Sequence, residues 1–299
     1  MNPEALVIGA NGLIGRYVTK ALTKASISWK GTYCKRPDAS FLKLNFLEEE
    51  EIKNILFSLT PKVVFLCSNL AGGVDFSQRH PKEARAFHVQ ALQKLGVYCH
   101  EIQAFLFFIS TDYVFDGTRG PYEENASPCP LNVYGRLKLE AEEWLQIHLS
   151  NYVIIRTTNV YGWDPDSVTP NYLMQLYRAM QEGKSFYAPS FLYGQPTYAR
   201  DLAQAMVELY QKKACGLYHI VGESMVNRWE WALQAASIFE FNYELIQERK
   251  TLPPSFVLRP LRSELSCQKF KSSFQTVLHD IKEGLELMKD EMVQSQPQD

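Results

Sequence analysis

Residues 5–15 read Ala5-Leu-Val-Ile-Gly-Ala-Asn-Gly-Leu-Ile-Gly15. A short apolar run suited to a buried strand leads into glycines spaced Gly-x-x-Gly-x-x-Gly and then into a helical pattern. We expect a tight turn at Gly9, close approach of the backbone to a phosphate at Gly12, and close helix–strand contact at Gly15. The helix would present free amides and its positive end to a pyrophosphate. The stretch predicts a dinucleotide cradle; a glycine-rich turn without a ligand is the alternative.

Outward from this stretch, the first half of the chain alternates short apolar runs with longer amphipathic stretches. Apolar strands separated by helices indicate a parallel sheet covered on both faces, in a doubly wound (Rossmann) α/β domain. The ligand crevice of such a domain lies beyond the carboxyl ends of its strands. The predicted strands are 5–9, 29–34, 63–67, 105–110 and 153–156, and the predicted helices are 13–25, 48–59, 82–101 and 133–149.

The pattern changes after about residue 160, where prolines interrupt it. Helices are predicted over 172–182, 200–212, 228–239 and 281–293. We expect residues 1–160 to form the cofactor-binding domain with the catalytic residues. Residues 161–299 should form mainly a smaller C-terminal substrate-binding lobe, with some segments returning to the core; long surface loops are the alternative.

Composition narrows the class of protein. With 46% hydrophobic and 21% charged residues, the 299-residue chain is typical of a folded globular protein. A net charge of -2 gives no electrostatic reason to expect a nucleic acid or a membrane surface as partner. The run 104–109 is too short for a membrane helix, and no signal peptide is expected. Scattered cysteines without a Cys-x-x-Cys pair favour a cytoplasmic location, and the histidine spacing predicts no metal site.

The run Thr32-Tyr-Cys-Lys-Arg36 ends the second predicted strand and bears on the choice of cofactor. An acidic residue here would bind the ribose 2′-hydroxyl of NAD, and the run has none. Lys35 and Arg36 would instead attract a 2′-phosphate, which an arginine can bind through two parallel hydrogen bonds. We therefore expect NADP(H) to be preferred and NAD(H) to be possible; two solvated surface charges are the alternative.

Tyr134 and Lys138 lie four positions apart at the start of a predicted helix. This spacing places both side chains on one face, where the lysine charge would favour the tyrosinate. A tyrosine so placed can protonate the alkoxide that forms when a ketone accepts a hydride. Thr111 or Ser110, at the end of a predicted strand, can donate to the substrate carbonyl; a turn hydroxyl is the alternative. We predict that Thr111, Tyr134 and Lys138 are the catalytic residues of a nicotinamide-dependent oxidoreductase.

With these residues identified, the chain resembles the extended short-chain dehydrogenase/reductases, and more narrowly the dTDP-4-dehydrorhamnose reductase group of nucleotide-sugar reductases. The similarity runs nearly from end to end. The Ser-Thr-Asp-Tyr-Val-Phe-Asp-Gly and Asn-x-Tyr-Gly-x-x-Lys blocks are specific to this group in combination. The matching segments are 9–15, 61–64, 110–117, 130–138, 156–162, 194–198 with 201–202, and 259–263.

The resemblance implies that Tyr134 protonates the C4 oxygen of a nucleotide-activated keto sugar and that Lys138 also binds the nicotinamide ribose. The predicted substrate-binding residues are Thr111, Asp112, Tyr113, Asn159, Gln195 and Arg259. The predicted cofactor-binding residues are Gly9, Asn11, Gly12, Leu13, Ile14, Gly15, Lys35, Arg36, Asn45, Phe46, Cys67, Ser68, Asn69, Gln90, Tyr134 and Lys138.

Several residues depart from the pattern of the group. Asn45 stands where an aspartate is expected, and Gln90 where an asparagine is usual. The bulkier run Cys67-Ser-Asn69 replaces three small residues. Asn159 replaces a tryptophan that would pack against the sugar, so a different hexose or pentose is expected. Tyr17 replaces an acidic residue associated with metal-linked dimers, which removes support for a magnesium site.

These features favour a cytosolic NADP(H)-dependent reductase of a nucleotide-activated 4-keto deoxysugar that serves surface polysaccharide biosynthesis. An epimerase or dehydratase of the same superfamily is an alternative; dehydratases usually carry a second acid where this chain has Tyr113. A non-catalytic NADP-binding regulatory subunit is another, because a regulatory subunit of methionine adenosyltransferase shares these motifs. We expect a monomer or a homodimer.

Overall fold

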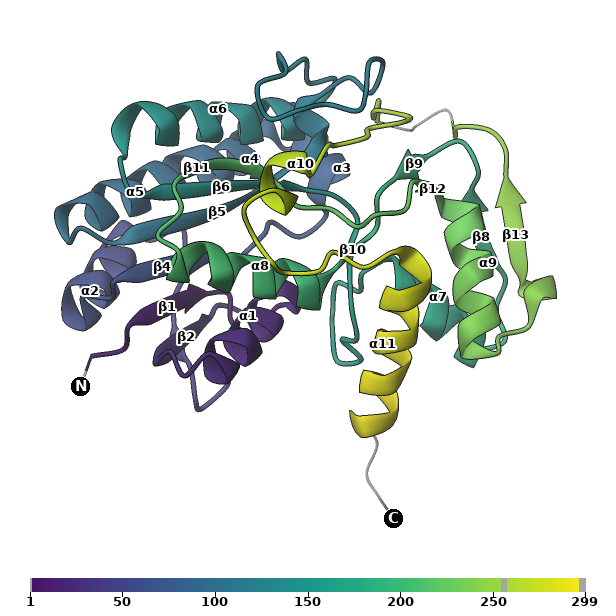
Figure 1. The fold of residues 1–299 in the computed structure, drawn as a ribbon, viewed down its shortest axis with the longest axis horizontal. Coiled ribbons are helices and arrows are strands. Elements are labelled where there is room, and N and C mark those ends of the chain that lie inside the picture. Colours follow the sequence, from purple (N-terminus) through teal and green to yellow (C-terminus); the bar gives the residue numbers. More distant parts are fainter. Residues whose placement is uncertain (1, 254–256, 296–299) are drawn as a thin grey trace.

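The computed structural model describes residues 2–253 and 257–295. At its centre lies a seven-stranded parallel sheet in the order β11-β6-β5-β4-β1-β2-β3 (Figure 1). Its strands are β1 (Ala5–Ile8), β2 (Trp29–Tyr33), β3 (Leu42–Lys43), β4 (Val63–Leu66), β5 (Phe105–Thr111), β6 (Tyr152–Thr157) and β11 (Gly216–His219). The predicted doubly wound α/β fold is confirmed.

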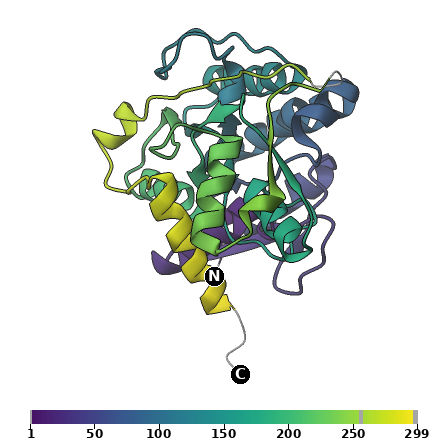
Figure 2. The same ribbon diagram turned by 90° about the vertical axis from the view of Figure 1, so that its right-hand side faces the viewer.

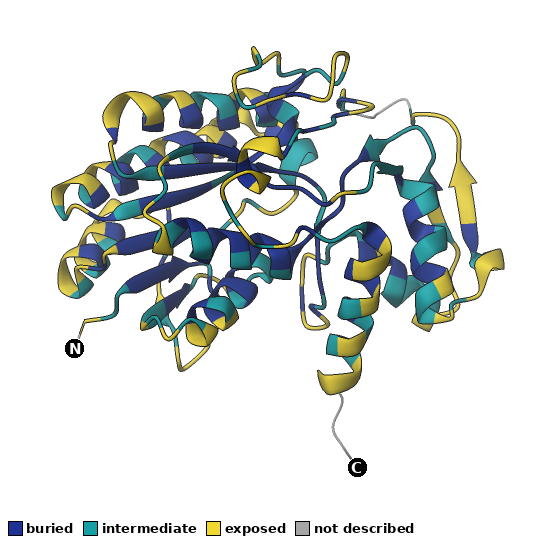
Figure 3. Ribbon diagram, viewed as in Figure 1, coloured by how far each residue is buried: buried dark blue, intermediate teal, exposed yellow. Residues whose placement is uncertain are grey.

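Successive side chains along each strand point to opposite faces of the sheet, so the interior is divided into two hydrophobic cores. In β1, Ala5 and Val7 face one core, and Leu6 and Ile8 face the other. Helices α1 (Leu13–Lys24) and α8 (Ala199–Gln211) pack together on the first face. Helices α2 (Glu49–Leu59), α5 (Leu92–Glu101) and α6 (Val133–His148) cover the second. Buried strands between two half-exposed helical layers are visible in Figure 3.

The sequence patterns did not predict two strands of the central sheet, one interruption of a helix, or the short strands of the lobe. Strand β3 has only two residues, too few to show a period. Strand β11 follows the proline-rich region but pairs in parallel with β6. The helix predicted over 82–101 is divided into α4 (Pro81–Arg85), a π-helical segment (Ala86–Ala91) and α5, and α3 (Gly73–Arg79) precedes it. Apolar periodicity does not distinguish a π-helical turn from an α-helical one.

A smaller lobe lies beside the carboxyl edge of the sheet and faces the viewer in Figure 2. It contains helices α7 (Tyr172–Gln181) and α9 (Arg228–Phe239), and α9 begins with a capping box between Asn227 and Glu230. Three small sheets complete it: β7 (Val160–Tyr161) with β10 (Thr197–Tyr198), β9 (Tyr193–Gly194) with β12 (Val226–Asn227), and β8 (Phe186–Pro189) with β13 (Ile246–Arg249).

The lobe and the sheet domain are joined by chain segments that cross between them. Strand β11, which follows residue 160, belongs to the central sheet, and helix α8 packs on α1 against that sheet. The domain boundary at residue 160 stays a prediction. The short α10 (Gln268–Lys271) lies against β11, and α11 (Ile281–Ser295) packs on α9. The Tyr17 hydroxyl of α1 donates to Glu291 of α11, which fastens the C-terminal helix to the sheet domain. In the described part of the chain, no helix has the length and apolar character needed to span a bilayer.

Candidate functional site

The turn between β1 and α1 has the geometry that a phosphate cradle requires. Gly9 has φ +82°, and a Cβ there would lie 2.9 Å from the Ser68 nitrogen. A Cβ on Gly15 would lie 2.2 Å from the Gly9 carbonyl oxygen, so helix and turn contact each other closely only because Gly15 has no side chain. Gly12 caps α1, and the half-buried Leu13 and Ile14 form its first turn with their amides at the open helix end.

Arg36 reaches back from the end of β2 to this turn. Its guanidinium donates to the Asn11 carbonyl at 2.6 Å and to the Asp166 carbonyl at 2.9 Å, while the Asn11 amide donates to the Arg36 carbonyl at 2.9 Å. Lys35 is exposed. Arg16, which we did not predict, forms an ion pair with the buried Asp164. Burial, and then the neighbouring Arg36 charge, lower the pKa of Arg16, so two guanidinium groups lie near each other beside the cradle.

The other predicted cofactor residues of the first half follow β3 and β4. Asn45 is half-buried and its side-chain oxygen accepts from the Leu47 amide at 3.2 Å. Phe46 is buried, with its ring 5.3 Å from that of Phe87. Because the strands are parallel, both lie at the same sheet edge as the cradle. Cys67, Ser68 and Asn69 lie there too, and the buried Ser68 hydroxyl has no hydrogen-bond partner among the described residues.

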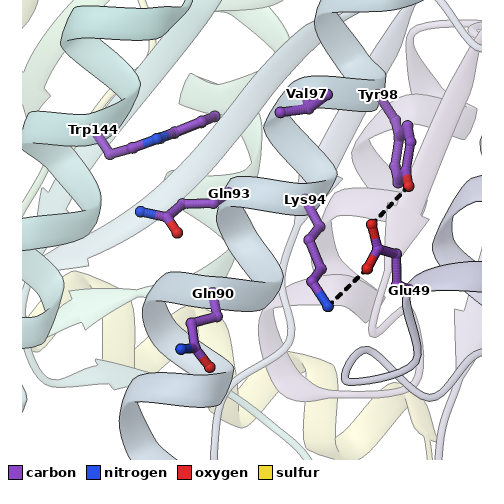
Figure 4. Close-up of a pocket in the computed structure, with 7 residues that line it drawn as sticks. All are labelled: Glu49, Gln90, Gln93, Lys94, Val97, Tyr98 and Trp144. Atoms are coloured by element: carbon purple, nitrogen blue, oxygen red, sulfur yellow. Dashed lines mark hydrogen bonds and ion pairs between the residues drawn. The ribbon is translucent and has the colours of Figure 1, made fainter.

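Gln90 does not lie with these residues. It is exposed and lines an outer hollow of about 530 Å³ between α2, α5 and α6, together with Lys94 and Trp144 (Figure 4). The π-helical turn instead directs His88 inward, where its ring lies edge-on to the Tyr134 ring at 5.3 Å. Its Nε2 is buried without a partner among the described residues. Burial, then the charge of Lys138, lowers the pKa of His88 to about 3, so the ring is neutral.

Strand β5 ends at Thr111 and continues as a short 3-10 turn over Asp112–Val114. The Thr111 hydroxyl donates to Asp112 at 3.1 Å and accepts from the Tyr113 amide at 3.2 Å. Asp112 is 3% exposed, and its burial raises its pKa to about 7, although hydrogen bonds from Thr111 and Thr158 act in the opposite direction. The site therefore contains a carboxyl group that titrates near neutrality.

Helix α6 brings Tyr134 to this strand end. Asn132 caps the helix by accepting from the Gly135 amide at 2.9 Å. A Cβ on Gly135 would lie 2.1 Å from the Tyr113 carbonyl oxygen, so the helix approaches the turn closely because this residue is glycine. Burial raises the pKa of the Tyr134 phenol, the Asp112 charge raises it further, and a hydrogen bond with Asn69 lowers it. The phenol is therefore protonated at neutral pH.

Lys138 is buried one turn after Tyr134. Its Nζ donates to the Ile109 carbonyl at 2.5 Å and lies 4.0 Å from the centre of the Phe108 ring. Desolvation lowers its pKa to about 7, against the charge of Glu142, which raises it. We expected this ammonium to favour the tyrosinate; in the structure, burial and the Asp112 charge instead raise the pKa of Tyr134. Within the described residues, no hydrogen bond directly joins Thr111, Tyr134 and Lys138.

A cavity of about 560 Å³ opens between this sheet edge and the lobe. It meets the candidate catalytic residues through Asn69, Asp112 and Tyr113. Asn159 lines it with φ +51°, and Arg259 lines it while donating to Asp75 at 2.5 Å. Other lining residues are Gly73, Thr158, Val160, Asn171, Tyr172, Gln175, Pro189, Leu192, Tyr193, Arg228 and Pro260.

Gln195, which we predicted to bind the substrate, lies in the protein interior away from the cavity wall. Its amide is buried, donating to the Leu265 carbonyl at 3.2 Å and accepting from the Leu265 amide at 2.7 Å. Both ends of the side chain therefore hold the backbone together, and Gln195 is not among the cavity-lining residues. Arg228, which we did not predict, takes a place in the cavity wall instead. Its sequence neighbourhood carries only a helix-start signal, which says nothing about what the side chain faces.

No group of three or more histidine, cysteine or acidic side chains within the described residues is arranged to hold a metal ion. The Tyr17 phenol, at the position where an acidic residue was considered, accepts from the Trp163 amide at 3.0 Å. Through its hydrogen bond to Glu291, Tyr17 links α1 to α11.

Comparison with known proteins adds to this geometry. The pattern that defines the family described as the RmlD substrate binding domain matches residues 3–294. Methionine adenosyltransferase 2 subunit beta of Danio rerio is 30% identical over 275 residues, which cover 90% of this chain and 84% of that protein. The dTDP-4-dehydrorhamnose reductase of Escherichia coli (strain K12) is 28% identical over 265 residues, covering 83% and 85%.

Solved structures show the same fold. The crystal structure of dTDP-4-dehydrorhamnose reductase from Bacillus anthracis, in complex with NADP, superposes with a TM-score of 0.87. The match covers 97% of this chain and all of the other at 23% identity. The arrangement of sheet and lobe described above is thus shared with that structure.

Proposed function

The chain belongs to the RmlD substrate binding domain family, and from this premise we propose that it is an NADP(H)-dependent reductase of the 4-keto group of a nucleotide-activated deoxysugar. The observation that carries this proposal is the close contact between the end of β5 and the start of α6, where the Tyr134 ring lies 6.3 Å from the Tyr113 ring and Lys138 donates to the Ile109 carbonyl. This contact brings Tyr134 and Lys138 to the end of the strand that carries Thr111. A cytoplasmic role in polysaccharide biosynthesis, as a monomer or homodimer, is part of the same proposal.

The residues around the cradle fit a dinucleotide. Side chains on Gly9 and Gly15 would collide with neighbouring atoms, and the buried Ser68 hydroxyl lacks a partner within the described chain. Gly12 and the first turn of α1 would hold the pyrophosphate, and Arg36 with Arg16 would bind a 2′-phosphate. This pair of guanidinium groups supports NADP(H) over NAD(H). When bound, the cofactor supplies a hydride.

The residues of the chain would then manage the proton and the carbonyl. Tyr134 holds a protonated phenol at neutral pH and would transfer its proton to the developing alkoxide. The Thr111 hydroxyl would turn from Asp112 to donate to the same oxygen, stabilising its charge. Lys138, with its pKa near 7 and one helical turn from Tyr134, would return a proton to it between cycles by leaving its hydrogen bond to the Ile109 carbonyl. The walls formed by Tyr113 and Tyr172 would exclude water from the sugar.

Replacing Tyr134 by phenylalanine tests this function. We expect oxidation of NADPH with a panel of nucleotide 4-keto sugars to fall about 10²- to 10⁴-fold, because the proton donor is lost. Binding of NADPH, measured by fluorescence titration, should persist. Tyr187→Phe is the matched control, because Tyr187 is 58% exposed on β13's partner strand β8. Wild-type protein that oxidises NADPH with none of the panel would contradict the proposal.

A second candidate is a non-catalytic NADP-binding subunit of a larger enzyme. It is favoured by the 30% identity to methionine adenosyltransferase 2 subunit beta over nine-tenths of the chain. On this hypothesis, the wild type binds NADPH without turnover and forms a stoichiometric complex with a partner enzyme, and Tyr134→Phe leaves that complex intact. Size-exclusion chromatography of the purified pair distinguishes the two candidates.

A further inference from the structure

Arg228 is fixed in the wall of the cavity by contacts from three directions. Its guanidinium donates to the side-chain oxygen of Asn159. The guanidinium carbon lies 4.8 Å from the Tyr172 ring centre and 5.3 Å from that of Trp231. The backbone is held as well, because its carbonyl accepts from the Tyr172 hydroxyl at 2.6 Å and its amide donates to Leu192 at 3.1 Å. Such a side chain is preorganised for a ligand.

The backbone conformation of Asn159 and the space around its side chain allow its contact with Arg228. It adopts φ +51°, a left-handed conformation that asparagine tolerates better than most residues. A Cβ on Gly194 would lie 2.2 Å from the Asn159 amide nitrogen, so the amide fits only because residue 194 is glycine. The short amide of Asn159 offers its oxygen to the Arg228 guanidinium in the cavity wall.

Arg228 forms no close ion pair within the described part of the chain. Among the described residues, no carboxylate lies within the 4.0 Å of an ion pair with it, whereas Arg259 in the same wall is paired with Asp75 at 2.5 Å. Asp112 is the acidic group of this cavity, and its charge acts on Arg228 from beyond ion-pair distance. Burial raises the pKa of Asp112 to about 7, so only part of this negative charge is present near neutral pH. A half-buried cation without a partner is unfavourable unless a ligand provides the opposite charge.

We propose that Arg228, held by Asn159, is an anion-binding residue of this cavity and that the ligand presents a phosphoryl or carboxylate oxyanion to it. The structure gives only one of the N–H groups of Arg228 to a side chain of the described residues, so others remain to bind two ligand oxygens. The inference rests on the proposed function, since it specifies the substrate of that site. The oxyanion belongs either to the diphosphate of a nucleotide sugar or to a carboxylate on the sugar.

Binding by isothermal titration calorimetry tests the proposal with UDP-glucose, dTDP-glucose and UDP-glucuronate as probes. Arg228→Gln should weaken binding about 10- to 150-fold, as expected for loss of a charge-assisted contact. Arg228→Lys, which keeps the charge and loses the planar fork, should weaken it less. Arg249→Gln is the control, because Arg249 also lies over a tyrosine ring, at 5.6 Å from Tyr187, but outside the cavity.

The pattern across the probes identifies the oxyanion. Equal weakening for all three points to the diphosphate, and weakening for UDP-glucuronate alone points to a sugar carboxylate; either supports the subsite. Equal affinity of the wild type and a folded Arg228→Gln protein for every probe overturns it, as does a wild type that binds none. Arg228-dependent binding without NADPH oxidation on any 4-keto sugar would contradict the reductase function and leave the subsite standing.

Discussion

The buried ion pair between Glu142 and Arg156 lies directly beneath the candidate catalytic residues. Arg156 donates to Glu142 through Nε at 3.1 Å to both oxygens and through a terminal nitrogen at 2.6 Å, and the Ser110 hydroxyl donates to the same carboxylate. The two side chains are 4% and 1% exposed. We predict that Glu142→Gln destabilises the protein by about 3–5 kcal/mol, because it leaves the Arg156 charge buried without compensation.

The surroundings of Arg156 explain why the predicted loss of stability is large. Arg156 has no other carboxylate within ion-pair distance among the described residues, and the adjacent His219 offers no negative charge. Burial, and then the Arg156 charge, lowers the pKa of His219 to about 3, so its ring is neutral beside the guanidinium. The predicted decrease in the free energy of unfolding is a large share of the 5–15 kcal/mol typical of folded proteins. Urea unfolding followed by circular dichroism would measure this decrease.

Glu140 provides a matched control in the same helix. It pairs with Arg85, but these side chains are 39% and 45% exposed, so Glu140→Gln should change stability by less than about 1 kcal/mol. Replacing both buried partners, as Glu142→Leu with Arg156→Met, should recover most of the lost stability because no unpaired charge remains. A Glu142→Gln protein within about 1 kcal/mol of the wild type would refute the reasoning.

Two further predictions concern charges at the site. The folded-state pKa of Lys138 is about 7, below its ordinary value of 10.5. The penalty for burying its charge is therefore fully present below pH 7 and disappears as the pH rises towards 10.5. The free energy of unfolding of the wild type relative to Lys138→Met should increase between pH 7 and 9, and a constant difference in urea unfolding would contradict this. Arg36→Gln should weaken NADPH binding about tenfold or more while changing NADH binding little, because Arg36 would meet the 2′-phosphate; equal losses for both cofactors in fluorescence titrations would exclude that role.

Local patterns in the sequence were sufficient for the framework of the protein. The run from Ala5 to Gly15 predicted a strand, a tight turn and a helix, since strand burial, the positive φ of Gly9 and the contact at Gly15 all depend on residues close in the chain. The spacing of Tyr134 and Lys138 placed both on one face of α6 for the same reason. The family resemblance is confirmed by the match over residues 3–294.

Packing between distant segments decided the rest of the site. Whether residue 88 or residue 90 faces inward depends on a π-helical turn whose extra residue rotates the helix, which an apolar period does not reveal. Arg228 meets Asn159 across 69 positions of sequence, and Gln195 is directed to Leu265 rather than to the cavity. Periodicity determines the elements because it reflects which faces avoid water; the meeting of side chains from separate elements depends on how those faces pack together.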